Sequence, residues 1–298
     1  MKKLLMSTAG VVLTIAICMG LAGCSGNGAL AEARSIRGEE VSEEEWNAAF
    51  KGLGGEEGFT VPLSAAPEEG QTPQVSPANF AVEYETETRM DVTVEEQTDN
   101  GEVLVEAAEA SVTMKIWATV TVADHKMHME VGYDGRVDGS ENVLEQLGGE
   151  TISGSGGVEV YTAVQDGVTQ VYARVDGGEW QTATGGASAL EGVSEAVLAQ
   201  IDVLIDELSD IGDYYGQYKD FTYNGDKKGY VYQDGSLGSA VGGMVGGDLI
   251  VKLRGGRLAA VLQEGEIDMD LLGVGITGSA AMGMVYTMGG QSVTLPKV

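Results

Sequence analysis

Alternation of apolar and polar residues is the dominant pattern of this chain from residue 79 onward. It begins with Phe80, Val82 and Tyr84 and continues in long runs rich in Val, Ile, Thr and Tyr, which turn residues such as Asp99-Asn100-Gly101 interrupt. Strict alternation places the apolar side chains on one face of a strand and the polar ones on the other. The pattern therefore predicts an antiparallel β-sheet with one apolar face.

The position of each turn can be tested, because a slip of one residue turns every side chain of a strand to the other face. A two-residue turn at Asp124-His125 sets apolar residues opposite each other on the two flanking strands. The pairs on one face are Val122–Met127, Val120–Met129, Ala118–Val131 and Ile116–Tyr133. Those on the other are Thr121–His128, Trp117–Gly132 and Lys115–Asp134.

Two further hairpins follow from the same test. With Asp166-Gly167 as a turn, the expected pairs are Val164–Thr169, Thr162–Val171, Val160–Ala173, Val158–Val175, Tyr161–Tyr172 and Glu159–Arg174. With Gly255-Gly256 as a turn, they are Leu253–Leu258, Val251–Ala260 and Leu249–Leu262. The chain ends in a strand-like run over 276–288 and a shorter one over 292–296.

Two segments have the helical period instead. Over residues 190–211 apolar residues recur every three or four positions, after a capping box of Ser188 and Glu191. A shorter helix is expected over 41–53, where Ser42 and Glu45 form a second capping box. About 9 to 11 strands with one long helix predict an α+β fold, of half-barrel plan.

The first residues carry an export signal. Lys2 and Lys3 precede an apolar run over 4–17, and Leu21-Ala22-Gly23-Cys24 follows. A basic start, a short apolar core and small residues before a cleavage site indicate a signal peptide over 1–23, not a membrane span. The ending is similar to the bacterial lipoprotein signal, in which the cysteine receives a diacylglyceryl group, so Cys24 is the expected lipid attachment site. Cleavage elsewhere, with Cys24 as an ordinary thiol, is the alternative.

The rest divides into a tether and one domain. Residues 24–40 are small and polar at first and are expected to form a flexible, lipid-anchored tether. The domain is expected over 41–298, with a Pro-containing loop over 54–78 that holds four of the five prolines.

Charge limits the partners. The net charge of −29 becomes −31 once residues 1–23 are removed, because they contain two lysines and no acid. Such a chain repels nucleic acid and anionic headgroups. Cys18 lies in the discarded segment and Cys24 is the anchor, so no disulfide is expected. The expected location is the outer face of the cytoplasmic membrane.

Several segments together resemble Gram-positive lipoproteins of the LolA-like/LppX-like superfamily. Besides the lipobox, they are Ser42-Glu43-Glu44-Glu45-Trp46-Asn47-Ala48-Ala49-Phe50, Asn79-Phe80-Ala81-Val82, Tyr218-Lys219-Asp220-Phe221, Gly255-Gly256-Arg257, Val285-Tyr286-Thr287-Met288 and Val293-Thr294-Leu295-Pro296. The resemblance implies a curved antiparallel half-barrel whose concave apolar face is covered by helices, with a lipid or lipid-linked chain held between them. The Pro-containing stretch and the extra glycines depart from the pattern.

A candidate ligand cleft follows. Its expected lining is Met114, Ile116, Val120, Met127, Met129, Val131 and Tyr133 from the sheet, with Leu204 and Leu208 from the long helix. Methionine suits such a wall because its flexible thioether adapts to irregular ligands. A dry core filled by these same side chains is the open alternative.

Catalytic and metal chemistry is not expected. His125 and His128 are the only histidines, and the nearby Glu130 is expected to be solvated with them. Asp134, Asp138 and Glu141 do not follow the order of a calcium loop. No G-x-S-x-G elbow or S-x-x-K motif occurs, so we expect neither an enzyme nor a cofactor.

The expected function is that of a membrane-anchored extracytoplasmic lipoprotein that binds a lipid or acylated molecule. The alternative is a surface scaffold or sensor with a filled core that binds a protein partner. A solute-binding protein of an importer would show alternating β-α units in two lobes, which this chain lacks.

Overall fold

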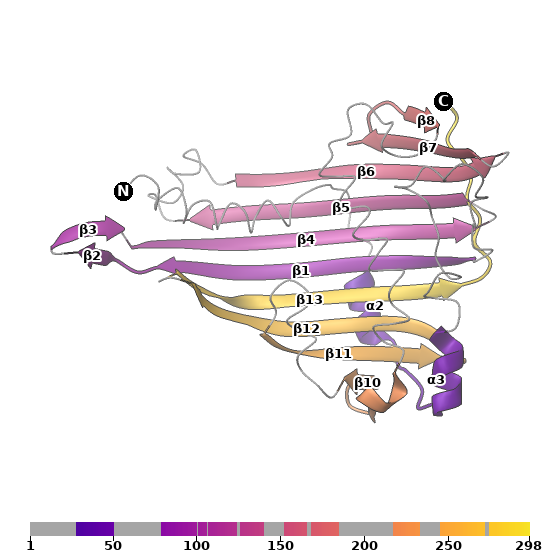
Figure 1. Ribbon diagram of the computed structural model, residues 1–298, viewed down its shortest axis with the longest axis horizontal. Coiled ribbons are helices and arrows are strands. Elements are labelled where there is room, and N and C mark those ends of the chain that lie inside the picture. Colours follow the sequence, from indigo (N-terminus) through magenta and orange to yellow (C-terminus); the bar gives the residue numbers. More distant parts are fainter. Residues whose placement is uncertain are drawn as a thin grey trace.

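The structure is a computed structural model, and it describes residues 28–50, 79–99, 101–105, 107–123, 126–139, 152–165, 168–184, 217–232, 245–271 and 274–298. Eleven of its strands form one antiparallel sheet that is not closed (Figure 1). Their order across the sheet is β8-β7-β6-β5-β4-β1-β13-β12-β11-β10-β9. The predicted antiparallel sheet of 9 to 11 strands is therefore confirmed.

The strands of the large sheet are β1 (Phe80–Val94), β4 (Ala108–Ala123), β5 (Lys126–Gly139), β6 (Ile152–Gln165), β7 (Val168–Val175), β8 (Gln181–Thr184), β9 (Phe221–Asn224), β10 (Gly229–Tyr232), β11 (Val245–Arg254), β12 (Arg257–Leu271) and β13 (Val274–Met288). A separate hairpin, β2 (Gln97–Asp99) and β3 (Glu102–Val105), extends beyond one end of the sheet (Figure 1). The helical elements are α2 (Ala29–Ser35), α3 (Glu43–Phe50) and the 3-10 turn η2 (Tyr218–Asp220).

Two of the three predicted hairpins have the predicted register. In β4–β5, Val120 is opposite Met129 and Trp117 is opposite Gly132. In β6–β7, Glu159 is opposite Arg174, and the other predicted pairs of both hairpins also match. The turn residues at 124–125 and 166–167 lie outside the described residues. Apolar matching across a turn was sufficient to set these registers.

The third hairpin keeps only its first predicted pair. Leu253 is opposite Leu258, but the register then shifts, so that Val251 is opposite Val261, not Ala260. Leu249 is likewise opposite Gln263, not Leu262. A β-bulge at Ala259 causes the shift, because one extra residue turns the following part of β12 over.

The short N-terminal helix is confirmed as α3. Its capping box forms as predicted: the backbone N–H of Ser42 donates to Glu45 Oε2 over 2.8 Å, and that of Glu45 donates to Ser42 Oγ over 3.3 Å. Hydrogen bonds from Ser42 also lower the pKa of Glu45. Trp46 and Phe50 are buried against the sheet. The predicted residues 51–53 lie outside the described residues.

The prediction of a flexible tether over 24–40 is wrong for its described part. Residues 29–35 form α2, whose Ala29, Leu30 and Ala33 are buried. These two alanines and one leucine pack on Ile250, Ala260, Leu262 and Val285 of the sheet. The composition of residues 24–40 resembles that of a linker, because a helix that buries only a narrow apolar stripe needs few large apolar residues.

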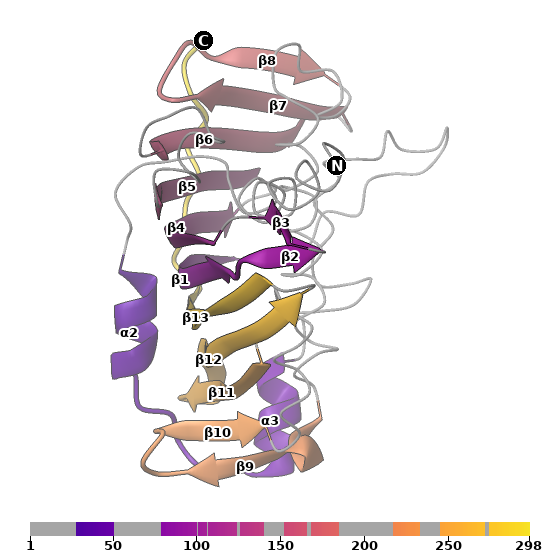
Figure 2. The same ribbon diagram turned by 90° about the vertical axis from the view of Figure 1, so that its left-hand side faces the viewer.

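The expectation of one apolar face is corrected by the same helix. Figure 2 shows α2 on one side of the sheet and α3 on the other. We call the side that α3 packs on the apolar face, and the opposite side the α2 face. Both carry buried apolar clusters, because α2 covers the part of its face over β1, β13 and β12.

The chain end is held by Asn79, not by strand pairing. Residues 289–298 are not part of a strand, in contrast to the strand-like run predicted over 292–296. The Asn79 side chain accepts from the backbone N–H of Gln291 over 2.8 Å and donates to its carbonyl over 3.0 Å. The predicted signal peptide, the loop over 54–78 and the long helix over 190–211 lie outside the described residues.

Candidate ligand-binding face

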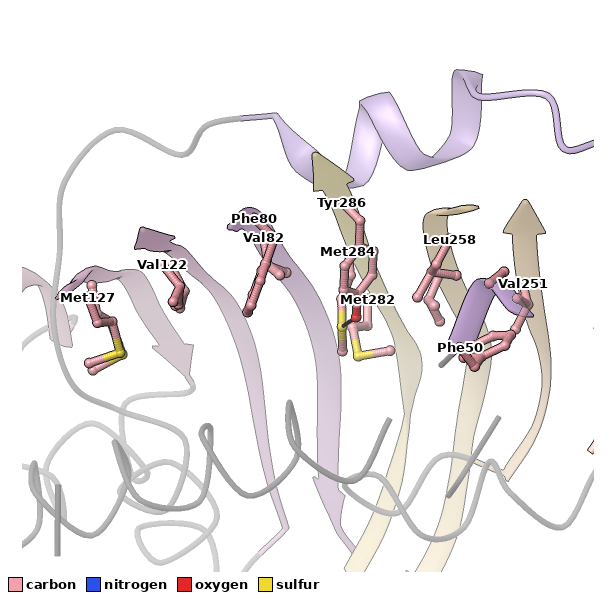
Figure 3. Close-up of a cluster of buried hydrophobic side chains, with 14 of the residues drawn as sticks. Phe50, Phe80, Val82, Val122, Met127, Val251, Leu258, Met282, Met284 and Tyr286 are labelled. Atoms are coloured by element: carbon pink, nitrogen blue, oxygen red, sulfur yellow. Dashed lines mark hydrogen bonds between the residues drawn. The ribbon is translucent and has the colours of Figure 1, made fainter. Parts of the chain in front are cut away.

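The main buried cluster of the apolar face crosses the sheet from β8 to β9. Figure 3 shows its side chains pointing from the strands to the side away from α2. Buried members of the cluster are Trp46, Phe50, Phe80, Val82, Val120, Val122, Met127, Met129, Val158, Val160, Val171, Val251, Leu253, Leu258, Met282, Met284 and Tyr286. Two-residue alternation in each strand puts them on the same side.

The seven sheet residues predicted to line a cleft share this face. Met114, Val120, Met127 and Met129 are buried. Ile116, Val131 and Tyr133 are half-buried, and the last two pack against the cluster. The two remaining predicted residues, Leu204 and Leu208, lie outside the described residues. The structure therefore brings the sheet residues together and does not describe the predicted lid.

Sequence reasoning missed the contribution of β13. Met282 and Met284 are buried opposite Thr86 and Tyr84 of β1, and the Tyr286 hydroxyl donates to Met284 Sδ over 3.2 Å. The signal was present, since residues 282, 284 and 286 alternate in the same way as the strands that were paired. Thioethers on β5 and on β13 thus give the face adaptable side chains at two places.

Aromatic rings close the face at α3. The ring centroid of Trp46 lies 5.1 Å from that of Phe50, 4.9 Å from that of Phe221 and 4.9 Å from that of Tyr230. Its indole Nε1 is buried with no hydrogen-bond acceptor among the described residues. A buried donor without an acceptor is uncommon in folded proteins.

Tyr230 fixes the segment before α3. Its hydroxyl donates to the carbonyl of Val41 over 2.7 Å and accepts from the backbone N–H of the same residue over 2.7 Å. Burial, opposed by the hydrogen bond to Val41 and supported by Tyr218, raises the pKa of Tyr230 to about 12. The phenol therefore stays protonated at neutral pH and holds its backbone partner.

On the α2 face, two buried charges hold the ends of α2. The backbone N–H of Leu30 donates to Glu85 Oε2 over 3.1 Å, and Glu85 also forms an ion pair with Lys115. At the other end, Lys252 Nζ donates to the carbonyl of Ala33 over 2.5 Å and to that of Arg34 over 3.3 Å. Burial, with the charge of Lys228, lowers the pKa of Lys252.

A glycine allows α2 to lie this close to the sheet. A Cβ at Gly283 of β13 would lie 2.6 Å from the Cα of Leu30, a backbone atom that cannot give way. The helix is therefore in backbone contact with the strand below it. Burial and the charge of the nearby Glu32 also raise the pKa of Glu83 on the same face.

Glu159 is the centre of a polar and aromatic cluster on the same face. His128 Nε2 lies 3.0 Å from Glu159 Oε1, the Tyr161 hydroxyl donates to that oxygen over 3.1 Å, and Arg174 Nε donates to Oε2 over 2.7 Å. Arg174 also lies over the ring of Trp180, 4.7 Å from its centroid. We call these five residues the Glu159 cluster.

The Glu159 cluster shifts two pKa values in opposite directions. Burial acts to raise the pKa of Glu159, but hydrogen bonds from Arg174, Tyr161 and His128 outweigh it and the pKa is lowered. Burial and the neighbouring carboxylate raise the pKa of Tyr161 to about 12. The carboxylate thus stays charged and the phenol stays neutral across the physiological range.

The cluster corrects the expectation that His128 and Glu130 are solvated together. His128 stacks on Tyr161 at 4.2 Å between ring centroids, and its polar partner is Glu159 of the next strand. Asp138 pairs with Arg136. Within the described ranges, no group of three or more His, Cys, Asp or Glu residues could hold a metal ion. His125 and Glu141 lie outside those ranges.

Comparisons with known proteins add no identity. No protein-family model matches the sequence, and no curated protein matches it. Among solved structures, the chain is similar to Ail, the attachment invasion locus protein of Yersinia pestis in complex with the heparin analogue sucrose octasulfate. The alignment has a TM-score of 0.14 and 7% identity and covers 70% of this chain and 99% of that one.

One further finding concerns the helices. Where the structure describes the chain, none of its helices has the length and apolarity needed to cross a membrane.

Proposed function

We propose that this chain is a lipoprotein anchored through Cys24 at the outer face of the cytoplasmic membrane, and that it binds an apolar ligand against its apolar face. The ligand class is a lipid or an acylated molecule, and no catalytic step is part of the proposal. The lipobox ending in Cys24 supports the anchor. The LolA-like/LppX-like resemblance remains a prediction that agrees with this function.

The observation that carries the proposal is the continuity of the apolar face. In the part of the chain that the structure describes, it runs through neighbouring strands from β8 to β9 with no buried ion pair, while the opposite face carries the buried Glu85 and Lys252. Burying acyl chains there would contribute about 25 cal/mol per Å² of apolar surface removed from water. Thioethers of Met127, Met129, Met282 and Met284 suit chains of variable length and unsaturation.

Trp46 offers the polar contact that such a ligand needs. Its Nε1, which has no acceptor among the described residues, lies at the α3 end of the apolar face. An ester or amide carbonyl at the head of an acyl chain is an acceptor of the right kind. This favours an acyl ester or amide over a plain hydrocarbon.

A second function is favoured by a different observation. Met129 is 0% exposed and Val120 is 1% exposed, as in a core filled by its own side chains. In that case the protein would be a surface scaffold or sensor whose exposed parts meet a protein partner. The same experiment separates the two functions.

Native mass spectrometry of protein extracted from its own membrane tests the proposal. We expect a bound lipid in addition to the diacylglyceryl group on Cys24, and a Cys24→Ala variant that lacks the covalent group but keeps the bound lipid. Met127→Gln should lower lipid occupancy, whereas His128→Gln, one residue along on the other face, should not. Met127→Leu keeps the face apolar and should retain the lipid.

The contrary result is equally clear. If folded, lipidated protein carries no bound lipid and takes up no added fatty-acyl ligand, the ligand-binding function is wrong and the filled scaffold stands. If no diacylglyceryl mass is found on Cys24, the anchor is wrong.

A further inference from the structure

We propose that the α2 face is turned toward the membrane and that the Glu159 cluster contacts the lipid headgroups. The inference rests on the proposed anchor at Cys24. It goes beyond that anchor, because it states which of the two faces lies against the bilayer. It follows from the length of chain before α2 and from the way in which α2 is fixed to the sheet.

The chain between the anchor and α2 is short. Cys24 and Gly28, the residue before α2, are four residues apart, so their Cα atoms lie at most ~14 Å from each other. A long tether would leave the domain free to tumble above the bilayer. This one keeps Gly28 within ~14 Å of the lipidated residue.

The sheet is too wide for so short a segment to pass around it. The N-terminus of α2 meets Glu85, which lies five residues inside the nearer end of β1 at Phe80, or ~17 Å at ~3.4 Å per residue. From β1 to either outermost strand there are five strand spacings, ~24 Å in total. The proposed anchor is therefore limited to the side of the sheet that α2 covers. Figure 2 shows α2 on that side.

The surface chemistry of that side suits a headgroup layer. Tyr161, Trp180 and Arg174 are half-exposed on it. Tyrosine and tryptophan have an apolar body and a polar tip, and arginine carries its charge on an apolar stem, which are the properties of side chains found at membrane–water interfaces.

Charge on this face is compensated only in part, because Asp91, Glu130 and Asp134 lie on it in addition to the residues of its ion pairs. Seven ion pairs lie on it or on the turn beneath it, namely Arg34–Glu264, Arg89–Glu87, Lys115–Glu85, His128–Glu159, Arg136–Asp138, Arg174–Glu159 and Lys227–Asp248. The whole chain still repels anionic lipid, so the acyl anchor must hold it in place. A zwitterionic bilayer is accordingly the right surface for a first test.

Two neighbouring residues of β8 allow a matched test. Thr182 is opposite Tyr172 on the α2 face, and Gln181 is opposite Ala173 on the apolar face. Both are exposed. The mature chain has no cysteine besides Cys24, whose sulfur the lipid occupies, so Thr182→Cys and Gln181→Cys each give one labelling site.

The experiment uses the full lipidated protein in phosphatidylcholine vesicles that contain a headgroup nitroxide. A fluorophore at Thr182→Cys should be quenched several-fold more strongly than one at Gln181→Cys. Inserting a Gly/Ser linker of about twelve residues before Gly28, with a reach of ~20 Å, should abolish the difference. Equal quenching at the two sites in the original chain would overturn the orientation.

Tryptophan emission tests the headgroup contact itself. Trp46 and Trp117 are 0% and 5% exposed, whereas Trp180 is half-exposed. The same vesicles should quench part of the tryptophan emission of the original protein, and this quenched part should be absent in Trp180→Phe. If Trp180→Phe is quenched to the same extent as the original protein, the contact is wrong. The mass of the Cys24 adduct in the same sample separates the cases. If the protein is lipidated but the two labelled sites are quenched equally, only the orientation is wrong. If Cys24 carries no lipid, the proposed anchor is wrong as well.

Discussion

Glu85 and Lys252 lie at opposite ends of α2, and each meets the end whose partial charge is opposite to its own. Glu85 accepts from the N–H of Leu30 in the first turn, and Lys252 donates to the carbonyls of Ala33 and Arg34 in the last. The free N–H and C=O groups of a short helix are costly when buried, and these two side chains satisfy them. Strands β1 and β11 thereby hold a seven-residue helix that would not be stable alone.

Replacing Lys252 by methionine should destabilise the protein by about 1–3 kcal/mol, because the last carbonyls of α2 lose their donor while they remain buried. Chemical denaturation measured by circular dichroism gives the free energy of unfolding. The exposed Lys219→Met is the control and should stay within about 0.5 kcal/mol of the original protein. An equal loss in both variants would contradict the role given to Lys252.

Gly132→Ala should be strongly destabilising. A Cβ at Gly132 would lie 1.9 Å from the ring of Trp117, so the buried indole would have to leave its place. Overpacking of this kind costs about 1–3 kcal/mol and sometimes more. Gly135→Ala in the same strand is the control, because its Cβ would have no atom nearer than 3.7 Å. Thermal melting of the two variants should rank them in this order.

Stability should fall at acid pH partly through Glu159. Its pKa is lowered in the folded state, so the carboxylate contributes stability that is fully present above its unfolded pKa and is lost as pH falls through the folded pKa. Glu159→Gln should flatten the pH dependence of unfolding below about pH 4.5. Glu179→Gln, at an exposed position, serves as the control, and identical curves for the two variants would refute the assignment.

At alkaline pH, Tyr161 and Tyr230 should act in the opposite direction. Burial raises the pKa of each to about 12, above the unfolded value of about 10. Their contribution to stability is therefore present below about pH 10 and is lost as pH rises toward about 12. The Tyr161→Phe, Tyr230→Phe double variant should lose less stability over this interval. Tyrosinate absorbance should show two fewer late-ionising phenols.

The sheet was predictable where one rule was enough. In β4–β5, pairing Val120 with Met129 put apolar residues together on one face and left Thr121 with His128 on the other. Because a one-residue slip would reverse that division, the sequence admits one register. The shared face of the predicted cleft residues follows from it directly.

The burial of the α2 face could not be predicted, because polar and charged residues alternate there as they do on an exposed face. The charge of Lys252 suggests a position in solvent, yet this residue is 1% exposed beneath α2. Ala259 and Ala260 are small enough to fit either face. The local sequence therefore does not indicate the β-bulge at Ala259, which changes the register with β11. The Glu159 cluster also depends on Trp180, which joins from a loop that strand alternation does not place.

The strands in the middle of the sheet are 14 to 16 residues long, whereas β8 and β9 at its two borders have four residues each. Molecules confined to one membrane meet one another edge to edge far more often than molecules in solution. A long border strand would present them with a row of free backbone groups on which to zip together. The two four-residue border strands of the described sheet therefore offer a second copy of this protein few free backbone groups to pair with.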